Sequence, residues 1–177
     1  MLFPDVICDV LTIGIGGRAR YHKFGGVSML SARLIHLIET HHREITERVL
    51  REIWRRQDLP HIRRLSEAEL RERGRTITEH LGEWLLGNEE EIGKRQEAVG
   101  RLRFEQSVPL HEAVHTLCLM KSTVIDFIEE QGIPRDTIGL YAEEELEHRL
   151  GKFFDQLIIH LVLGYEGAWR RAVRAAA

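Results

Sequence analysis

The chain reads PLHEAVHTLCLMKSTVIDFIEEQ from Pro109 to Gln131, and this stretch decides the fold class. Its apolar residues recur every three or four positions, which is the spacing of one face of an α-helix. That face carries Leu110, Val114, Leu117, Val124 and Ile128. Pro109 suits the first turn of a helix, and Gly132 and Pro134 follow as a stop signal. The stretch therefore predicts one long amphipathic helix.

The same periodicity extends on both sides of this segment, so nearly everything after Met29 predicts helix. Ser66 followed by Glu69 is a capping-box pattern that opens one of these helices. Gly151 is a position where the last helix could bend. We expect four further helices, at about residues 30–57, 67–86, 89–106 and 136–172. The prediction is an all-α protein with a bundle of about five or six helices.

Residues 1–28 differ from the rest of the chain. They contain short β-favouring runs, five glycines and no helical periodicity before Met29. We interpret 1–28 as an irregular, non-core N-terminal extension and 29–177 as the helical domain. Gly25 and Gly26 could be encoded as a ribosome-binding sequence, so the sequence leaves open whether Met1 or Met29 is the native start.

Composition argues against several classes of protein and partner. The chain has 25 Lys and Arg against 28 Asp and Glu, without the basic excess typical of nucleic-acid binders. Cys8 and Cys118 form no CxxC pair, which favours a reducing, cytoplasmic location. The apolar run from Val6 to Ile15 contains Asp9 and is too short to cross a bilayer. We therefore expect neither a nucleic-acid partner nor a membrane.

An arginine-rich region extends from Arg48 to Arg75 and contains nine arginines. Glutamates and aspartates are interleaved with them throughout. Such alternation is typical of an ion-paired helix surface rather than of a patch that follows phosphates.

His111, Glu112 and His115 form a literal HExxH, the motif with which some metalloproteases bind zinc. At about 100° per residue, both histidines fall roughly 100–140° from the apolar face of their helix. A zinc protease needs them directed into a cleft, together with a third ligand. We therefore predict a solvated pair without a catalytic metal.

Two further patterns resemble enzyme motifs without their context. Glu112 to His115 and Glu145 to His148 are both ExxH, as in di-iron bundles, but His148 falls nearly opposite its helix's apolar face. Gly14–Ala19 satisfies GxGxxA, but no helical pattern follows it. We expect no catalytic residue, no metal and no cofactor.

Charged or polar residues at core-facing positions are the candidates for a ligand pocket. A charge there must extend to solvent, pair with another charge or meet an anionic ligand. For each charged candidate, pairing with another charge and exposure to solvent remain alternatives to ligand binding. For the histidine, simple burial is a further alternative. The candidate pocket residues are Lys121, Arg103, Arg95 and His42.

Apolar residues outside the predicted core faces are candidates for a dimer interface. Leu50 and Trp54 lie off the apolar stripe of residues 30–57, and Trp169 lies near the chain end. Apolar strips on helix surfaces usually mark association, so we expect a homodimer that uses these three residues.

Several helix-packing segments make the chain resemble the N-terminal sensor-domain family of RsbR-type proteins, the RsbT co-antagonists of bacterial stress signalling. The likeness covers about residues 30–170. It lies in segments 65–70, 100–112, 117–121, 153–155 and 164–166 and around Trp84. The resemblance implies a haemless globin-like fold, a dimer and an input module that acts on an output domain. It supplies no catalytic residue.

We therefore expect a non-catalytic, cytoplasmic, bacterial sensory or regulatory domain that acts on a downstream signalling protein or output domain. The alternative is a metal- or haem-binding helical protein with redox or hydrolytic activity. No output domain follows before Ala177, so the chain is either a stand-alone protein or an excised domain. The signal and the output partner are not specified by the sequence.

Overall fold

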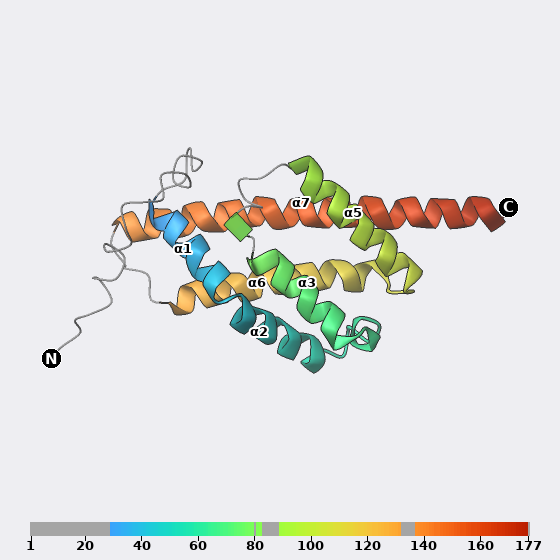
Figure 1. Ribbon diagram of the computed structural model, residues 1–177, viewed down its shortest axis with the longest axis horizontal. Coiled ribbons are helices and arrows are strands. Elements are labelled where there is room, and N and C mark those ends of the chain that lie inside the picture. Colours follow the sequence, from blue (N-terminus) through green and yellow to red (C-terminus); the bar gives the residue numbers. More distant parts are fainter. Residues whose placement is uncertain (1–28, 80, 83–88, 132–136, 177) are drawn as a thin grey trace, which may run out of the picture.

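The computed structural model describes residues 29–79, 81–82, 89–131 and 137–176 (Figure 1). Every element in these ranges is helical, which confirms the all-α prediction. The predicted N-terminal extension and its GxGxxA pattern lie outside the described residues. The elements are α1 (Met29–Thr40), α2 (His42–Arg55), the 3₁₀ helix η2 (Ile62–Arg64), α3 (Glu67–Glu79), α5 (Glu89–Glu105), α6 (Leu110–Glu130) and α7 (Thr137–Ala176).

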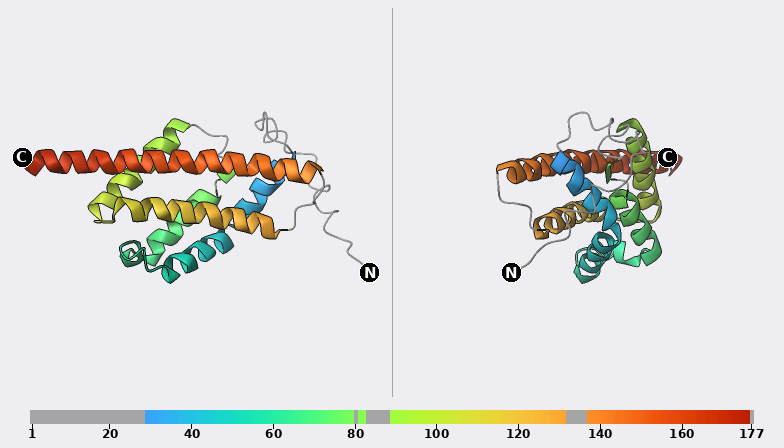
Figure 2. Two further views of the ribbon diagram at one scale, coloured as in Figure 1. Left: turned by 180° about the vertical axis from the view of Figure 1, so that it is seen from behind. Right: turned by 60° about the vertical axis from the view of Figure 1, so that its left-hand side comes forward.

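The longest helix, α7, has 40 residues and forms one side of the bundle. α6 runs beside it in the opposite direction and α5 crosses it (Figures 1 and 2). α2 lies on the other side of α6 from α7, and α3 packs against α2. The C-terminal part of α7 projects past the other helices in both side views. α7 continues as helix through Gly151, so the bend considered at that position does not interrupt it.

The backbones of α5 and α7 touch where the two helices cross. A Cβ added to Gly100 of α5 would overlap the carbonyl oxygen of Leu161, and one added to Gly164 of α7 would overlap that of Glu97. A glycine is therefore required on both sides of the crossing. The neighbouring Tyr165 holds the connection between α5 and α6, because its hydroxyl donates a hydrogen bond to the carbonyl oxygen of Val108 at 3.0 Å.

The expectation of one helix over residues 30–57 is wrong, because the chain breaks at His41 between α1 and α2. His41 has φ −100° and ψ 20°, outside the helical region. Its Nδ1 lies 2.9 Å from the carbonyl oxygen of Leu37, and its ring packs on Phe127 with centroids 5.5 Å apart. The break is therefore held by tertiary contacts and not by a proline or glycine.

Leu50 was expected outside the core, and that expectation is also wrong. Its side chain is only 3% exposed. The reason is that α2 packs against both α3 and α6, so its buried face is wider than a single stripe. Trp54, at the end of the same helix, is exposed as expected.

The predicted start of a helix at residue 67 is confirmed, because α3 begins at Glu67. Ser66 Oγ accepts a hydrogen bond from the backbone N–H of Glu69 at 3.1 Å, which is half of the predicted capping box. The Glu69 carboxylate does not return to Ser66 but pairs with Arg103. The stop signal at residues 132–134 lies outside the described residues.

Within the described ranges, no helix is both long enough and apolar enough to cross a membrane. A globin-like arrangement of the helices stays a prediction.

Candidate functional site

A small cavity of about 50 Å³ lies between α2, α3, α5 and α6, and α7 closes it with Leu161. Most of its wall is apolar, including Ile77, Leu117 and Met120. Polar side chains enter the wall at four positions. These are Arg73, Gln96, Arg103 and Thr116.

An outer groove of about 250 Å³ adjoins this inner cavity. Arg73, Val99 and Arg103 belong to the walls of both, so they mark the boundary between the groove and the cavity. The remaining groove residues are Glu69, Glu72, Thr76 and Leu102. We call the two spaces together the two-arginine cavity.

Arg103 of α5 has its charge matched within the protein. It is 5% exposed, forms an ion pair with Glu69 of α3 and donates a hydrogen bond to Gln106. Gln106 Nε2 in turn donates to Glu69 Oε2 at 3.1 Å. Burial alone would raise the pKa of Glu69, but the hydrogen bond and charge of Arg103 outweigh it and hold that pKa below the ordinary value. This trio therefore carries no net charge.

Arg73 of α3 is different, because no carboxylate among the described residues pairs with it. Its guanidinium donates to the amide oxygen of Gln96 on α5. Burial, with a smaller contribution from the positive charge of Arg103, lowers the pKa of Arg73 to about 10. Arg73 therefore stays protonated at neutral pH. Gln96 is 1% exposed, and its Nε2 donor has no hydrogen-bond partner among the described residues.

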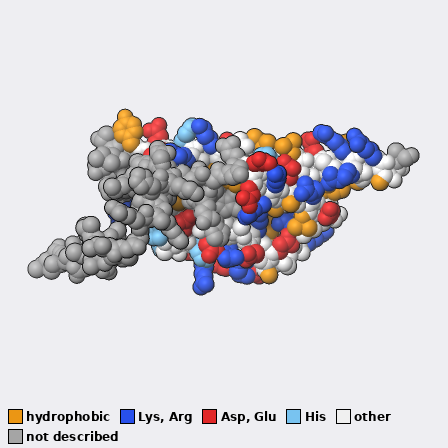
Figure 3. Space-filling view, turned by 45° about the horizontal axis from the view of Figure 1, so that its top comes forward, with side chains coloured by type: hydrophobic (Ala, Val, Ile, Leu, Met, Phe, Trp, Pro, Cys, Tyr) orange, Lys and Arg blue, Asp and Glu red, His pale blue; other side chains and the backbone are white. Residues whose placement is uncertain are grey.

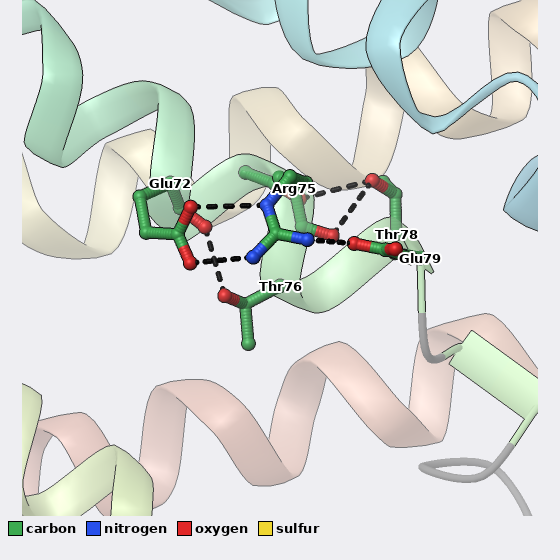
Figure 4. Close-up of polar contacts among 6 residues, drawn as sticks. Glu72, Arg75, Thr76, Thr78 and Glu79 are labelled. Carbon is green, nitrogen blue, oxygen red and sulfur yellow. Dashed lines mark hydrogen bonds and ion pairs between the residues drawn. The ribbon is translucent and has the colours of Figure 1, made fainter.

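The rest of the arginine-rich α3 surface is ion-paired, as the sequence indicates (Figure 4). Arg75 lies between Glu72 and Glu79 and donates to Glu72 at 2.7 and 3.0 Å. Hydrogen bonds from Arg75 to Glu72 raise the pKa of Arg75 and lower that of Glu72. Arg71 pairs in the same way with Glu47 on α2, which leaves Arg73 as the exception.

Of the four predicted pocket residues, only Arg103 lines the two-arginine cavity. Arg95 was expected near a pocket, but it lies on the surface and pairs with Glu91. Lys121 lies between α6 and α7, with its Nζ 3.9 Å from Asp155. His42 has a buried Nδ1 with no hydrogen-bond partner, but it does not line the cavity.

Arg73 and Gln96 were missed by the sequence analysis. Arg73 follows Leu70 by three residues and precedes Gly74, both of which are buried, so its place beside the apolar stripe was a usable signal. That signal was hidden because Arg73 lies among arginines that do pair with acids.

The HExxH motif has a structural explanation at Glu112. This carboxylate is 1% exposed and accepts hydrogen bonds from the backbone N–H groups of His61 and Ile62 at 2.8 and 3.0 Å. Burial alone would raise the pKa of Glu112, but these hydrogen bonds and the one with the His61 ring hold it below the ordinary value. Glu112 thus holds the start of η2 against α6.

The two histidines of the motif lie away from the core, as predicted. His111 is exposed, and His115 Nδ1 lies 3.1 Å from Asp58. No group of three or more His, Cys, Asp or Glu side chains in the described part of the chain could hold a metal ion. The absence of a catalytic metal stays a prediction that elemental analysis can test.

One side of α7 exposes large apolar side chains. The members of this α7 face are Ile159, Leu163, Trp169 and Val173, each at least 50% exposed. Hydrophobic and charged side chains alternate along this part of the molecule, and Lys and Arg gather toward its C-terminal end (Figure 3). Trp169 was predicted as an interface residue, and its exposure leaves that role open.

Comparison of the chain with family models, with curated proteins and with solved structures found no match. The resemblance to RsbR-type sensor domains therefore stays a prediction, and the function has to be inferred from the two-arginine cavity and the α7 face.

Proposed function

We propose that the chain is a non-catalytic sensory or regulatory domain in which a small ligand in the two-arginine cavity changes the surface that α7 presents. One observation carries the proposal. The same cavity is walled by a partly buried Arg73, which has no carboxylate partner among the described residues, and by Leu161 of α7. A side chain that can bind an anion and a side chain of the longest helix therefore line the same cavity.

Tight packing between α5 and α7 provides the route of transmission. Gln96, Val99 and Arg103 of α5 line the cavity, and Gly100 lies between them against the backbone of α7. Close-packed helices do not deform continuously, so a shift of α5 must move α7 or repack their contact. Binding at the cavity therefore changes the position of the α7 face.

The output we propose is association through the α7 face, first with a second copy of this chain. Four half-exposed apolar side chains lie on it, and burying the exposed half of each contributes about half of the ~1.5–3 kcal/mol that full burial gives. A two-fold interface counts every such contact twice. Trp54, exposed at the end of α2, extends the interface if the copies meet there, whereas Leu50 belongs to the core.

The proposal includes the features that the resemblance to RsbR-type sensor domains implies. These are a globin-like arrangement of helices, a cytoplasmic bacterial setting and a downstream signalling protein or output domain. The all-helical architecture is compatible with them.

A cavity-filling substitution tests the coupling. Ala113 of α6 is 3% exposed and lines the cavity, so Ala113→Val places two extra carbons where a ligand would bind. We expect it to shift the dimer dissociation constant, measured by analytical ultracentrifugation, and the amide hydrogen exchange of α7. Ala98→Val, at an exposed position on α5, is the matched control and should change neither. Equal behaviour of the two folded variants would contradict the proposal.

A further inference from the structure

We propose that the two-arginine cavity binds a monovalent carboxylate with a short apolar chain, its charged group at Arg73 and Gln96 and its chain in the inner cavity. This inference deepens the proposed function by naming the class of ligand, and it rests on that function only for the consequence of binding.

The positive charge of Arg73 is not matched by a carboxylate among the described residues. The charge of Arg103 is matched by Glu69, whereas Arg73 has no carboxylate partner among the described residues. A partly buried cation without a carboxylate partner is costly, and a ligand that brings one anionic group removes much of that cost. Glu69 and Glu72 also line the outer groove, so a second negative charge on the ligand would be repelled.

The free donors match a carboxylate in number and kind. A guanidinium has five N–H donors, and Arg73 gives one to Gln96 Oε1. Gln96 Nε2 is buried without an acceptor. A carboxylate can accept a hydrogen bond from the unpaired Nε2 group of Gln96 and also from the Arg73 guanidinium. The contact with Arg73 is strengthened by opposite charge and can involve two parallel N–H···O bonds.

The inner cavity sets the size and polarity of the rest of the ligand. Its wall beyond the arginines is formed by apolar side chains such as Ile77, Leu117, Met120 and Leu161. The space is about 50 Å³, against the ~10–15 Å³ that one water molecule needs. A chain of a few carbons fits this space, and a simple inorganic anion would leave its apolar part unfilled. A long acyl chain exceeds it.

Butyrate is the probe for the test, and NMR titration of the full chain is the measurement. We expect saturable shifts at the amides of Arg73, Gly74 and Gln96 at matched ionic strength. Butyramide lacks the charge, succinate has two charges, and chloride lacks the chain. Each should bind at least about tenfold more weakly than butyrate. The loss corresponds to the free energy of one charged contact or of burying a few methylene groups.

Substitutions locate the site. Arg73→Met should abolish butyrate binding and leave the fold intact, because it replaces a partly buried cation with an apolar side chain of similar length. Arg73→Lys should retain part of the affinity. Arg71→Met, on the exposed face of the same helix, should leave binding unchanged. Equal binding of butyrate and butyramide, or undiminished binding by Arg73→Met, would overturn the inference.

The outcomes for the ligand and for the sensor function can be told apart. If butyrate binds at Arg73 but does not change dimerisation, the ligand inference holds and the proposed function fails. If Ala113→Val shifts dimerisation and none of the anions binds, the ligand inference fails and the proposed function holds.

Discussion

Glu112 on α6 and His61 before η2 form one compact unit, although they are 51 residues apart in sequence. The carboxylate contacts the His61 ring at 2.5 Å and accepts the backbone N–H of the same residue at 2.8 Å. A single buried acid thus holds the connection between α2 and α3 against α6.

Replacing Glu112 by Gln should lower the stability of the fold at neutral pH. The amide can accept fewer hydrogen bonds from His61 and Ile62, and the expected loss is ~1–3 kcal/mol in the free energy of unfolding. Urea denaturation measures it. Glu129→Gln, at an exposed position on α6, is the control and should stay within ~0.5 kcal/mol of the parent.

The same substitution should remove part of the pH dependence of stability. The pKa of Glu112 is lower in the folded protein than its ordinary value of 4.5. Its contribution is therefore present above pH 4.5 and is lost as the pH falls through the folded pKa. The parent and Glu112→Gln should converge in stability on acidification, and a constant difference down to the acid limit would contradict this.

The close contact between α5 and α7 predicts that two glycines of α7 respond differently to replacement by alanine. Gly164→Ala should destabilise the protein by ~3 kcal/mol or more, because the added methyl overlaps the backbone of Glu97. Gly167→Ala should be tolerated or slightly stabilising, because its Cβ would meet only the end of Arg171 at 3.7 Å. Thermal unfolding of the pair measures the contrast, and similar melting temperatures would show that the backbones do not touch there.

The α7 face predicts a monomeric variant. Leu163→Glu combined with Trp169→Glu should give folded monomer, because both side chains are exposed in the single chain and needed only for association. Ala172→Glu, on another side of the same helix, should leave the dimer intact. Light scattering with circular dichroism is the measurement. A parent that is already monomeric at high micromolar concentration would remove the basis for the interface.

Removal of residues 1–28 should leave the melting temperature within a few degrees of the parent. The side chains of the described helices already form one continuous core, which includes Phe127, Phe154 and Leu150. A large loss of stability on deletion would show that the N-terminal residues belong to the folded domain.

The sequence was a good guide to the helices, because their ends depend on local signals. α5 and α6 begin and end within one or two residues of the predicted limits, since Pro109 and the apolar periodicity act within a few residues. The break at His41 has no such signal. It depends on contacts with Phe127, which lies more than eighty residues away in the chain.

The candidate site was harder to predict, because it depends on which charges remain unpaired. Arg103 was identified from its place on a core-facing position. Arg73 was not, because every arginine of the region has acids nearby in sequence, and only the packing of α3 on α5 shows that Arg73 meets Gln96 instead. Lys121 and Arg95 show the converse, because both were expected to line a pocket and both pair with an acid instead. The partner of Lys121 is Asp155 on α7, and that of Arg95 is Glu91 on the preceding turn of α5.

α7 continues as one helix beyond its contact with α5, so a change of direction at that contact displaces its C-terminal end. With a rise of about 1.5 Å per residue, Gly164 and Ala176 are about 18 Å apart along the helix axis. The part of α7 beyond the glycine contact is then an arm that moves with any change of helix direction at that contact. A bend of about 10° in α7 there would displace Ala176 by about 3 Å. A movement too small to open the cavity visibly would thus be amplified at the far end of the helix.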